Sequence, residues 1–328
     1  MDKKYWNWVD FTKALAIALV VCGHCFEDGA IRNTIYLFHI PLFFIISGYL
    51  SDYSSPKTGS WPSVKYMLYA VLIYNIFFIA LTLAKNIAFG QSITMLLVLR
   101  YIYGIVSPYY VDSYALPVLA QFWFIFVLVF MKCFYKYLSK LKNNYIWAFL
   151  VFCIAVSYFQ KETNVFWFFI SRTLLAFPFF ILGNMLRKTN IIDKVISWKI
   201  HSKLIIFALL VILFLSLGRL NGIQRTDMFH FSTGNSILLY YLCALAGSCS
   251  SILLALLIGN KKNKIIKTYA LGTFFILATH MHLMRVLRIF IESPFIVFLL
   301  IMLLSYYPIL VLQKHCPLLL GKAPAKKL

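Results

Sequence analysis

The chain has 328 residues, of which 62% are hydrophobic, 18% are aromatic and only 12% are charged. Soluble domains are nearer half apolar and a quarter charged, so this composition excludes a soluble globular protein and indicates an integral membrane protein. The net charge of +21 does not indicate nucleic-acid binding, because the lysines and arginines fall in short clusters between apolar runs, which is a pattern of membrane topology.

Apolar runs long enough to cross a bilayer recur about ten times along the chain, since a spanning helix needs roughly 20 residues. We therefore predict an all-α fold, a polytopic bundle of about ten transmembrane helices that occupies residues 1–328 as a single domain. A short basic cytoplasmic tail is expected at about 313–328. The predicted spans are 9–26, 34–50, 66–87, 118–135, 145–160, 165–186, 204–220, 235–259, 268–290 and 294–312.

The distribution of Lys and Arg predicts how these helices are oriented. Of the 31 such residues, 21 fall at the termini and in every second loop, eight fall in the opposite loops, and Lys13 and Arg172 lie inside predicted helices. Because basic residues gather on the cytoplasmic side, both termini are predicted to be cytoplasmic. The longest opposite connection, about 88–117, is long enough for a re-entrant or interfacial segment, which leaves nine to eleven spans open.

The first predicted helix carries three titratable side chains, Asp10, Lys13 and His24. Charged groups at membrane depth are costly, so each is a functional candidate. Lys13 and His24 are eleven residues apart, almost three full turns, and therefore point from one helix face, roughly 16 Å apart along it. Asp10 lies one turn before Lys13, close enough to pair with it. The structural alternative is that Asp10 and Lys13 extend to the interface and that His24 caps the helix.

Further polar candidates follow along the chain. His39 lies near the outer end of the second predicted helix, where Pro41 should kink the backbone, while Ser47 and Gly48 allow close helix approach. A lone histidine there is also consistent with a packed hydrogen-bond partner. Arg172, inside the sixth predicted helix, must pair or face water; it either holds helices together or binds an anion.

His280 and His282 lie in the ninth predicted helix and are two residues apart, so they point to nearly opposite faces and only one is expected in a site. The run Cys22-Gly23-His24-Cys25 does not indicate a metal, because adjacent ligands on one helix cannot all face a single ion. No metal site is expected.

Several segments resemble the membrane acyltransferase family 3, in particular its fucose 4-O-acetylase-like branch. The resemblance covers essentially the whole chain, and its most specific part is the first fifty residues. The segments are Asp10-Phe-Thr-Lys13-Ala-Leu-Ala-Ile with ten residues between Lys13 and His24, Phe38-His39-Ile40-Pro41-Leu42-Phe43-Phe44-Ile45-Ile46-Ser47-Gly48-Tyr49-Leu50, Phe122-Trp123-Phe124, Arg172 with Phe177-Pro178-Phe179-Phe180-Ile181-Leu182-Gly183, and Leu271-Gly272 leading to His280.

The resemblance implies an O-acetyltransferase that moves an acetyl group from cytoplasmic acetyl-CoA to a hydroxyl of a surface polysaccharide or a lipid-linked sugar. It implies a multi-pass protein of a bacterial cytoplasmic membrane, in contact with membrane lipids. Transfer is expected to be direct or to use separate envelope glycan-assembly proteins as partners. Lys13 stands where many members carry Arg, so it would act on a phosphate as a point charge rather than as a bidentate fork.

The implied roles divide the candidates into three groups. His24 would be the general base or a transient acetyl carrier, with Asp10 orienting Lys13. Lys13 and Arg172 would bind the donor or stabilise an anionic intermediate. The candidate acceptor contacts are His39, His280, Ser47 and Trp123.

Two other functions fit part of the pattern. A transporter or flippase of glycan intermediates explains the buried charges but not the spacing of Lys13 and His24. A glycan polymerase predicts a large polar outer loop, whereas the longest outer stretch here is about thirty residues and mostly apolar.

Overall fold

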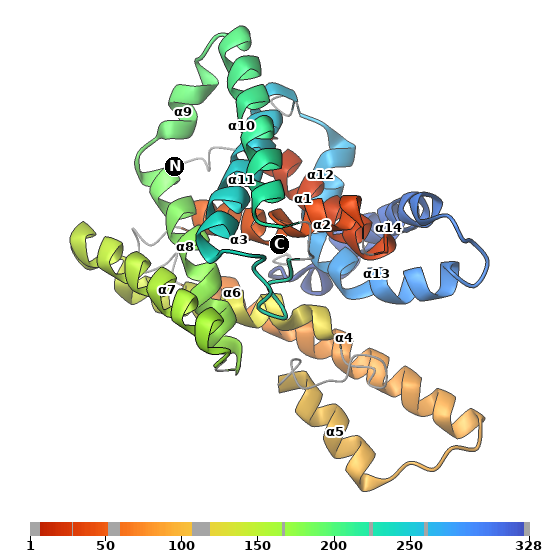
Figure 1. The fold of residues 1–328 in the computed structure, drawn as a ribbon. Helices are drawn as coiled ribbons and strands as arrows, with labels where there is room; N and C mark the ends of the chain where they lie inside the picture. Colours follow the sequence, from red (N-terminus) through yellow and green to blue (C-terminus); the bar gives the residue numbers. More distant parts are fainter. Residues whose placement is uncertain are drawn as a thin grey trace.

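The computed structural model describes residues 7–27, 29–51, 60–106, 119–165, 168–222, 226–258 and 262–324. Over these ranges the chain is all-helical, as predicted (Figure 1). The helices up to residue 163 are α1 (Asn7–Cys25), α2 (Ala30–Tyr36), α3 (His39–Leu50), α4 (Ser60–Ala88), α5 (Met95–Val106), the 3-10 turn η2 (Ala120–Phe122), α6 (Trp123–Leu138) and α7 (Asn143–Thr163). The later ones are α8 (Phe168–Lys188), α9 (Ile191–Ile196), α10 (Ile200–Leu220), α11 (Ile237–Ile258), α12 (Lys264–Leu271), α13 (Thr273–Leu287), α14 (Pro294–His315) and η3 (Pro317–Leu320).

Eight spans within the described residues are long and apolar enough to cross a membrane, and nine if the bent pair α12–α13 is one span. These spans agree with nine of the ten predicted ones within a few residues at each end. The tenth prediction, 145–160, falls on α7, a 21-residue helix that is not among the eight and carries Gln160, Lys161 and Glu162 near its end. The 88–117 connection contains the short helix α5, and its residues 107–117 lie outside the described part of the chain.

Two predicted helices are broken rather than continuous. The 34–50 helix is divided into α2 and α3 just before His39, close to the kink expected from Pro41. The prediction of one helix over 268–290 was wrong, because α12 and α13 meet at Gly272 with a bend of 76°. A Cβ at Gly272 would lie 2.3 Å from Cδ1 of Ile309 in α14, so only glycine allows this approach.

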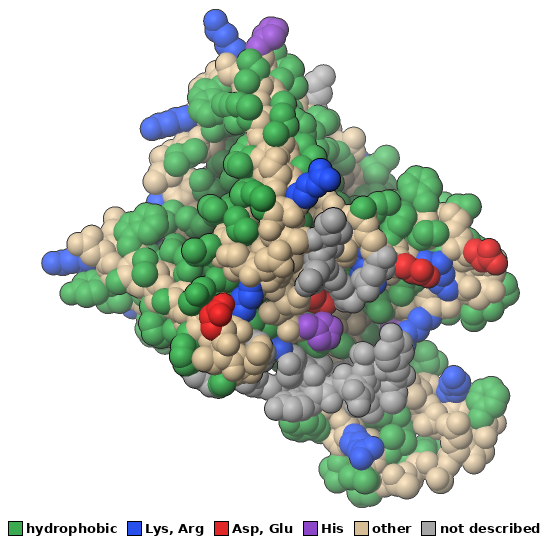
Figure 2. Space-filling view, in the orientation of Figure 1, with side chains coloured by type: hydrophobic (Ala, Val, Ile, Leu, Met, Phe, Trp, Pro, Cys, Tyr) green, Lys and Arg blue, Asp and Glu red, His purple; other side chains and the backbone are tan. Residues whose placement is uncertain are grey.

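The amino-terminal helices α1, α2 and α3 lie in the middle of the molecule, and later helices surround them (Figure 1). Helix α1 packs against α3, α11, α12, α13 and α14. By contrast, only 6% of the apolar 18-residue stretch of α10 is buried inside the protein. Helices α4 and α5 extend away from the bundle. Hydrophobic side chains cover most of the visible face, with basic groups scattered over it (Figure 2). This exposed apolar surface is the surface expected to face lipid.

The closest helix crossing joins α3 to α8 through a pair of glycines. A Cβ built on Gly48 would lie 2.0 Å from the backbone oxygen of Phe180, and one built on Gly183 would lie 1.9 Å from the backbone oxygen of Ile45. Neither position has room for even a methyl group, so the two backbones touch directly. The predicted role of Gly48 in close helix approach is confirmed, and Gly183 is its partner.

Polar side chains of α8 complete this crossing at the end of α3. The Asn184 amide donates to the backbone oxygen of Ser51 at 2.9 Å and accepts from the hydroxyl of Tyr135 at 3.0 Å. Arg187 donates to the backbone oxygens of Tyr49 and Leu50 at 3.4 Å. The terminal carbonyls of α3, which have no partner within their own helix, are thus satisfied by α8.

We expect Gly183→Ala to destabilise the protein by about 3 kcal/mol, because the added methyl group meets backbone atoms that cannot move aside. The measurement is the thermal unfolding midpoint in detergent, followed by tryptophan fluorescence. Gly29→Ala is the matched control, since the nearest atom to a Cβ there is 3.9 Å away. Equal midpoints for the two variants would mean that the α3–α8 crossing tolerates separation.

Candidate active site

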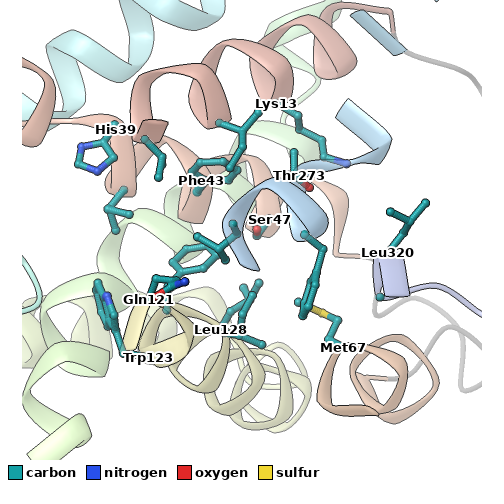
Figure 3. A pocket seen from close by; sticks show the side chains of 18 of the residues that line it. Lys13, His39, Phe43, Ser47, Met67, Gln121, Trp123, Leu128, Thr273 and Leu320 are labelled. Atoms are coloured by element: carbon teal, nitrogen blue, oxygen red, sulfur yellow. The ribbon is translucent and has the colours of Figure 1, made fainter. Parts of the chain in front are cut away.

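A cavity of about 260 Å³ lies between α1, α3, α6 and the start of α13 (Figure 3). Its wall includes five of the predicted site residues: Lys13, His24, His39, Ser47 and Trp123. In Figure 3, Lys13 and Leu320 lie on one side of the cavity, whereas His39 and Trp123 lie on the other. The cavity therefore has two chemically different ends, which we call the lysine end and the histidine end.

Helix α1 runs from one end of the cavity to the other. Lys13 and His24 both line the wall, as their spacing along one helix face predicts. The two positions are eleven residues apart, a rise of roughly 16 Å, which sets the separation of the two ends along the helix.

The histidine end is a cluster of aromatic rings around His24. The Tyr36 hydroxyl lies 3.3 Å from Nδ1 of His24, and the ring of His280 lies 5.2 Å from that of His24 between centroids. Tyr36 also packs on His39, with ring centroids 4.9 Å apart. A single tyrosine on the short helix α2 thus joins two of the predicted site histidines.

Hydrogen bonds determine the tautomers of the two other histidines. Nδ1 of His39 lies 2.8 Å from the backbone oxygen of Ile35, and Nδ1 of His280 lies 2.9 Å from that of Ile276. A carbonyl only accepts, so both Nδ1 atoms carry the proton and both Nε2 atoms are acceptors. Nε2 of His280 is buried without a hydrogen-bond partner in the described part of the chain. His282, in contrast, stacks on Phe78 with ring centroids 3.9 Å apart, so the two histidines have different neighbours, and neither is among the residues that line the cavity.

The lysine end brings together three lysines that are far apart in sequence. Lys13 of α1, Lys132 of α6 and Lys322 near the carboxyl end all line the cavity. Asp10 acts electrostatically on both Lys13 and Lys322. By sequence, Lys132 and Lys322 belong to the 21 basic residues that are assigned to the cytoplasmic side.

Arg172 is buried, with 2% of its surface exposed, and is not among the residues that line the cavity. Its Nε donates to the backbone oxygen of Phe229 at 2.9 Å. Phe229 in turn packs on the cavity residue Trp123, with ring centroids 5.7 Å apart. Arg172 therefore does not line the cavity itself. It binds the segment of residues 226–236, which we call the 226–236 hairpin, and this hairpin contacts the cavity residue Trp123 through Phe229.

The 226–236 hairpin is held tightly against the bundle. Asp227 and Ser232 exchange two backbone hydrogen bonds of 2.8 and 2.9 Å. The Lys161 ammonium donates to the backbone oxygens of Gly234 and Asn235 at 2.8 and 2.6 Å. The buried Asn221 amide donates to the backbone oxygen of Thr233 at 2.8 Å. A segment predicted only as a loop thus packs against the bundle and contacts the cavity residue Trp123 through Phe229.

Asp227 is the acidic group of this hairpin, and the sequence analysis missed it. It pairs with His230 at 2.8 Å and acts electrostatically on His24 and His39. Tyr36 was missed as well. The sequence held a signal for each residue. The chain has only ten acidic residues, so Asp227, close to Phe229 and His230, is unusual. Tyr36 lies three residues before His39 and therefore on the same side of the predicted helix.

The predicted site residues thus fall into two groups. Five line the cavity directly. The other three contact or influence a neighbour of the cavity: Asp10 acts electrostatically on Lys13, Arg172 binds the 226–236 hairpin, and His280 lies beside His24. Within the described ranges, no group of three or more His, Cys, Asp or Glu side chains could hold a metal ion.

Comparison with known proteins gives two similarities. The profile of a family described as an acyltransferase domain matches residues 6–313, nearly the whole chain. The nodulation protein NolL of Sinorhizobium fredii (strain NBRC 101917 / NGR234) is 36% identical over 90 residues, which cover 24% of this chain and 25% of NolL. The chain therefore matches only about a quarter of the length of that relative. No solved structure shows significant similarity to it.

We expect Arg172→Gln to loosen the 226–236 hairpin. Losing a charged hydrogen bond, worth about 1.5–3 kcal/mol, should speed amide hydrogen exchange at residues 227, 229 and 232 by about tenfold or more. Exchange followed by mass spectrometry in detergent measures this. Arg219→Gln, at an exposed position of α10, is the control. Unchanged exchange in Arg172→Gln would show that this guanidinium does not hold the hairpin.

Proposed function

The chain belongs to acyltransferase family 3, and on that premise we propose that it is a membrane O-acetyltransferase. It takes the acetyl group from acetyl-CoA and transfers it to a hydroxyl of a surface polysaccharide or a lipid-linked sugar. The observation that carries the proposal is a single cavity with lysines at one end and histidines at the other. A phosphate-bearing donor suits the first end, and a proton transfer suits the second.

The proposed orientation places the lysine end at the cytoplasmic face of a bacterial inner membrane. The charge distribution along the chain supports this, because most Lys and Arg lie on the side of the termini. Lys322 acts electrostatically on Lys13 and Asp10, so the described carboxyl end lies beside the start of α1. Acetyl-CoA then enters from the cytoplasm, and the acceptor reaches the histidine end from the opposite side.

His24 is the proposed general base. With Nδ1 turned to the Tyr36 hydroxyl, Nε2 is the nitrogen left for substrate. The sugar oxygen attacks the thioester carbonyl carbon while its proton passes to Nε2. The tetrahedral intermediate collapses, the carbon–sulfur bond breaks, and the imidazolium returns the proton to the CoA sulfur. Asp227 supports this role, since a nearby carboxylate stabilises the imidazolium that forms.

The neighbours of His24 receive positioning roles. The ring of His280 lies 5.2 Å from that of His24, so His280 is a proposed positioning residue for that imidazole. His39, Ser47 and Trp123 line the same cavity and are proposed acceptor contacts. Arg172 positions the 226–236 hairpin, and Asp10 orients Lys13 at the donor end.

We expect His24→Ala to lower acetyl transfer by about 10²–10⁴-fold, the usual contribution of a general base. The measurement is mass spectrometry of cell-surface glycan from cells that express wild type or His24→Ala at matched membrane levels. An ester-labile mass increment of one acetyl group should appear with wild type and be lost with the variant.

Two results would contradict this assignment. Equal acylation with both proteins would mean that His24 is not catalytic. Absence of acylation with both, together with a change in the amount of exported glycan, would instead favour a transporter or flippase of glycan intermediates.

The orientation is tested with sealed membrane vesicles, because acetyl-CoA is charged and does not cross a bilayer. External labelled acetyl-CoA should acetylate a lumenal acceptor in inside-out vesicles, whereas right-side-out vesicles should be inactive until they are permeabilised. The reverse pattern would invert the topology. In the same vesicles without acceptor, labelled CoA should not exchange into acetyl-CoA; exchange would make His24 an acetyl carrier rather than a base.

A further inference from the structure

The carboxyl-terminal residues 317–322 form a structured segment, which we call the C-terminal strap. After α14, η3 packs against α4, α13 and α14. The Tyr74 hydroxyl of α4 donates to the backbone oxygen of Leu319 at 3.0 Å. Gly321 then turns the chain with φ of +67°, a conformation suited to glycine, beside the ring of Phe274. This turn directs Lys322 to the cavity wall.

Among the described residues, three lysines line the lysine end, and the carboxylate of Asp10 acts on two of them. The charge of Lys13 repels that of Lys322 and disfavours the charged form of Lys322. Asp10 is the acidic side chain that acts on Lys13 and Lys322 within the described residues. Burial, followed by the charge of Lys13, lowers the pKa of Lys322 to about 8. Three like charges held around one cavity are stabilised when an anion occupies it.

We propose that the C-terminal strap completes a phosphate-binding subsite, in which Lys322 joins Lys13 and Lys132 around a phosphate group of the acyl donor. The inference rests on the proposed function and deepens it, because it assigns to Lys322 a contact with a phosphate group of that donor. Lysine suits this role as a point charge with three rotatable N–H donors. The distance to the histidine end, roughly 16 Å along α1, then places the thioester away from the phosphates.

The subsite explains why the strap is fastened to three helices rather than free. A lysine on an untethered tail loses rotational and backbone freedom when it binds a phosphate, and that loss weakens binding. The hydrogen bond from Tyr74 and the turn at Gly321 fix the backbone before the donor arrives. The strap therefore presents Lys322 already beside Lys13.

The experiment measures equilibrium binding of CoA and of pantetheine, which lacks all phosphates, to the purified full chain in nanodiscs. Lys322→Gln should weaken CoA binding by about tenfold or more, the loss expected for one charged hydrogen bond. Its affinity for pantetheine should equal that of wild type. Lys322→Arg should keep most of the CoA affinity, because it keeps the charge. Lys264→Gln, which removes an exposed lysine outside the cavity, should change neither affinity.

Three results would overturn the inference. CoA affinity that is the same in Lys322→Gln and wild type would exclude a phosphate contact. Equal losses for CoA and pantetheine would indicate that Lys322 supports the fold or binds an anionic lipid headgroup. A wild type that does not bind CoA would exclude the subsite altogether. Loss of CoA binding in Lys322→Gln, in a protein that transfers no acetyl group, would instead leave the subsite standing and refute the proposed function.

Discussion

The contact on which the site depends is the direct backbone contact between α3 and α8 at Gly48 and Gly183. Each glycine lies against a carbonyl oxygen of the other helix, so the two backbones are closer than any side chain would allow. In a bilayer such close approach matters, because helix association there relies on packing and hydrogen bonds rather than on exclusion of water. Helix α3 carries His39, Phe43 and Ser47 into the cavity wall, and the crossing fixes where that wall stands.

The same helix pair connects the cavity to the 226–236 hairpin. Helix α8 holds Gly183 at the crossing and, about three turns earlier, Arg172, which binds the hairpin backbone. The hairpin places Asp227 within electrostatic reach of His24 and His39. An arginine buried at membrane depth is costly unless it is paired, and here Arg172 is paired with the backbone oxygen of Phe229.

The cavity separates two kinds of chemistry along one helix. The proposed binding of an anionic donor at the lysine end and the proposed proton transfer at the histidine end need different surroundings. The first needs an excess of positive charge, and the second needs acceptor nitrogens held in defined tautomers. Helix α1 supplies one residue to each, and neighbouring helices complete both ends. Such an arrangement suits a reaction whose two substrates come from opposite sides of a membrane.

The fold class follows from the amino-acid sequence alone, because runs of about 20 apolar residues leave few alternatives to spanning helices. The sequence also indicates that Lys13 and His24 share a face, since helix geometry depends only on spacing, and that Gly48 marks a close approach. The bend at Gly272 is visible only in the tertiary structure, where this residue lies close against Ile309 on another helix. Only the folded chain shows that Lys132 and Lys322 line the cavity and that Asp227 lies near His24, because these positions depend on contacts between segments far apart along the chain. Periodicity describes one helix at a time, whereas a cavity is formed by the faces of several.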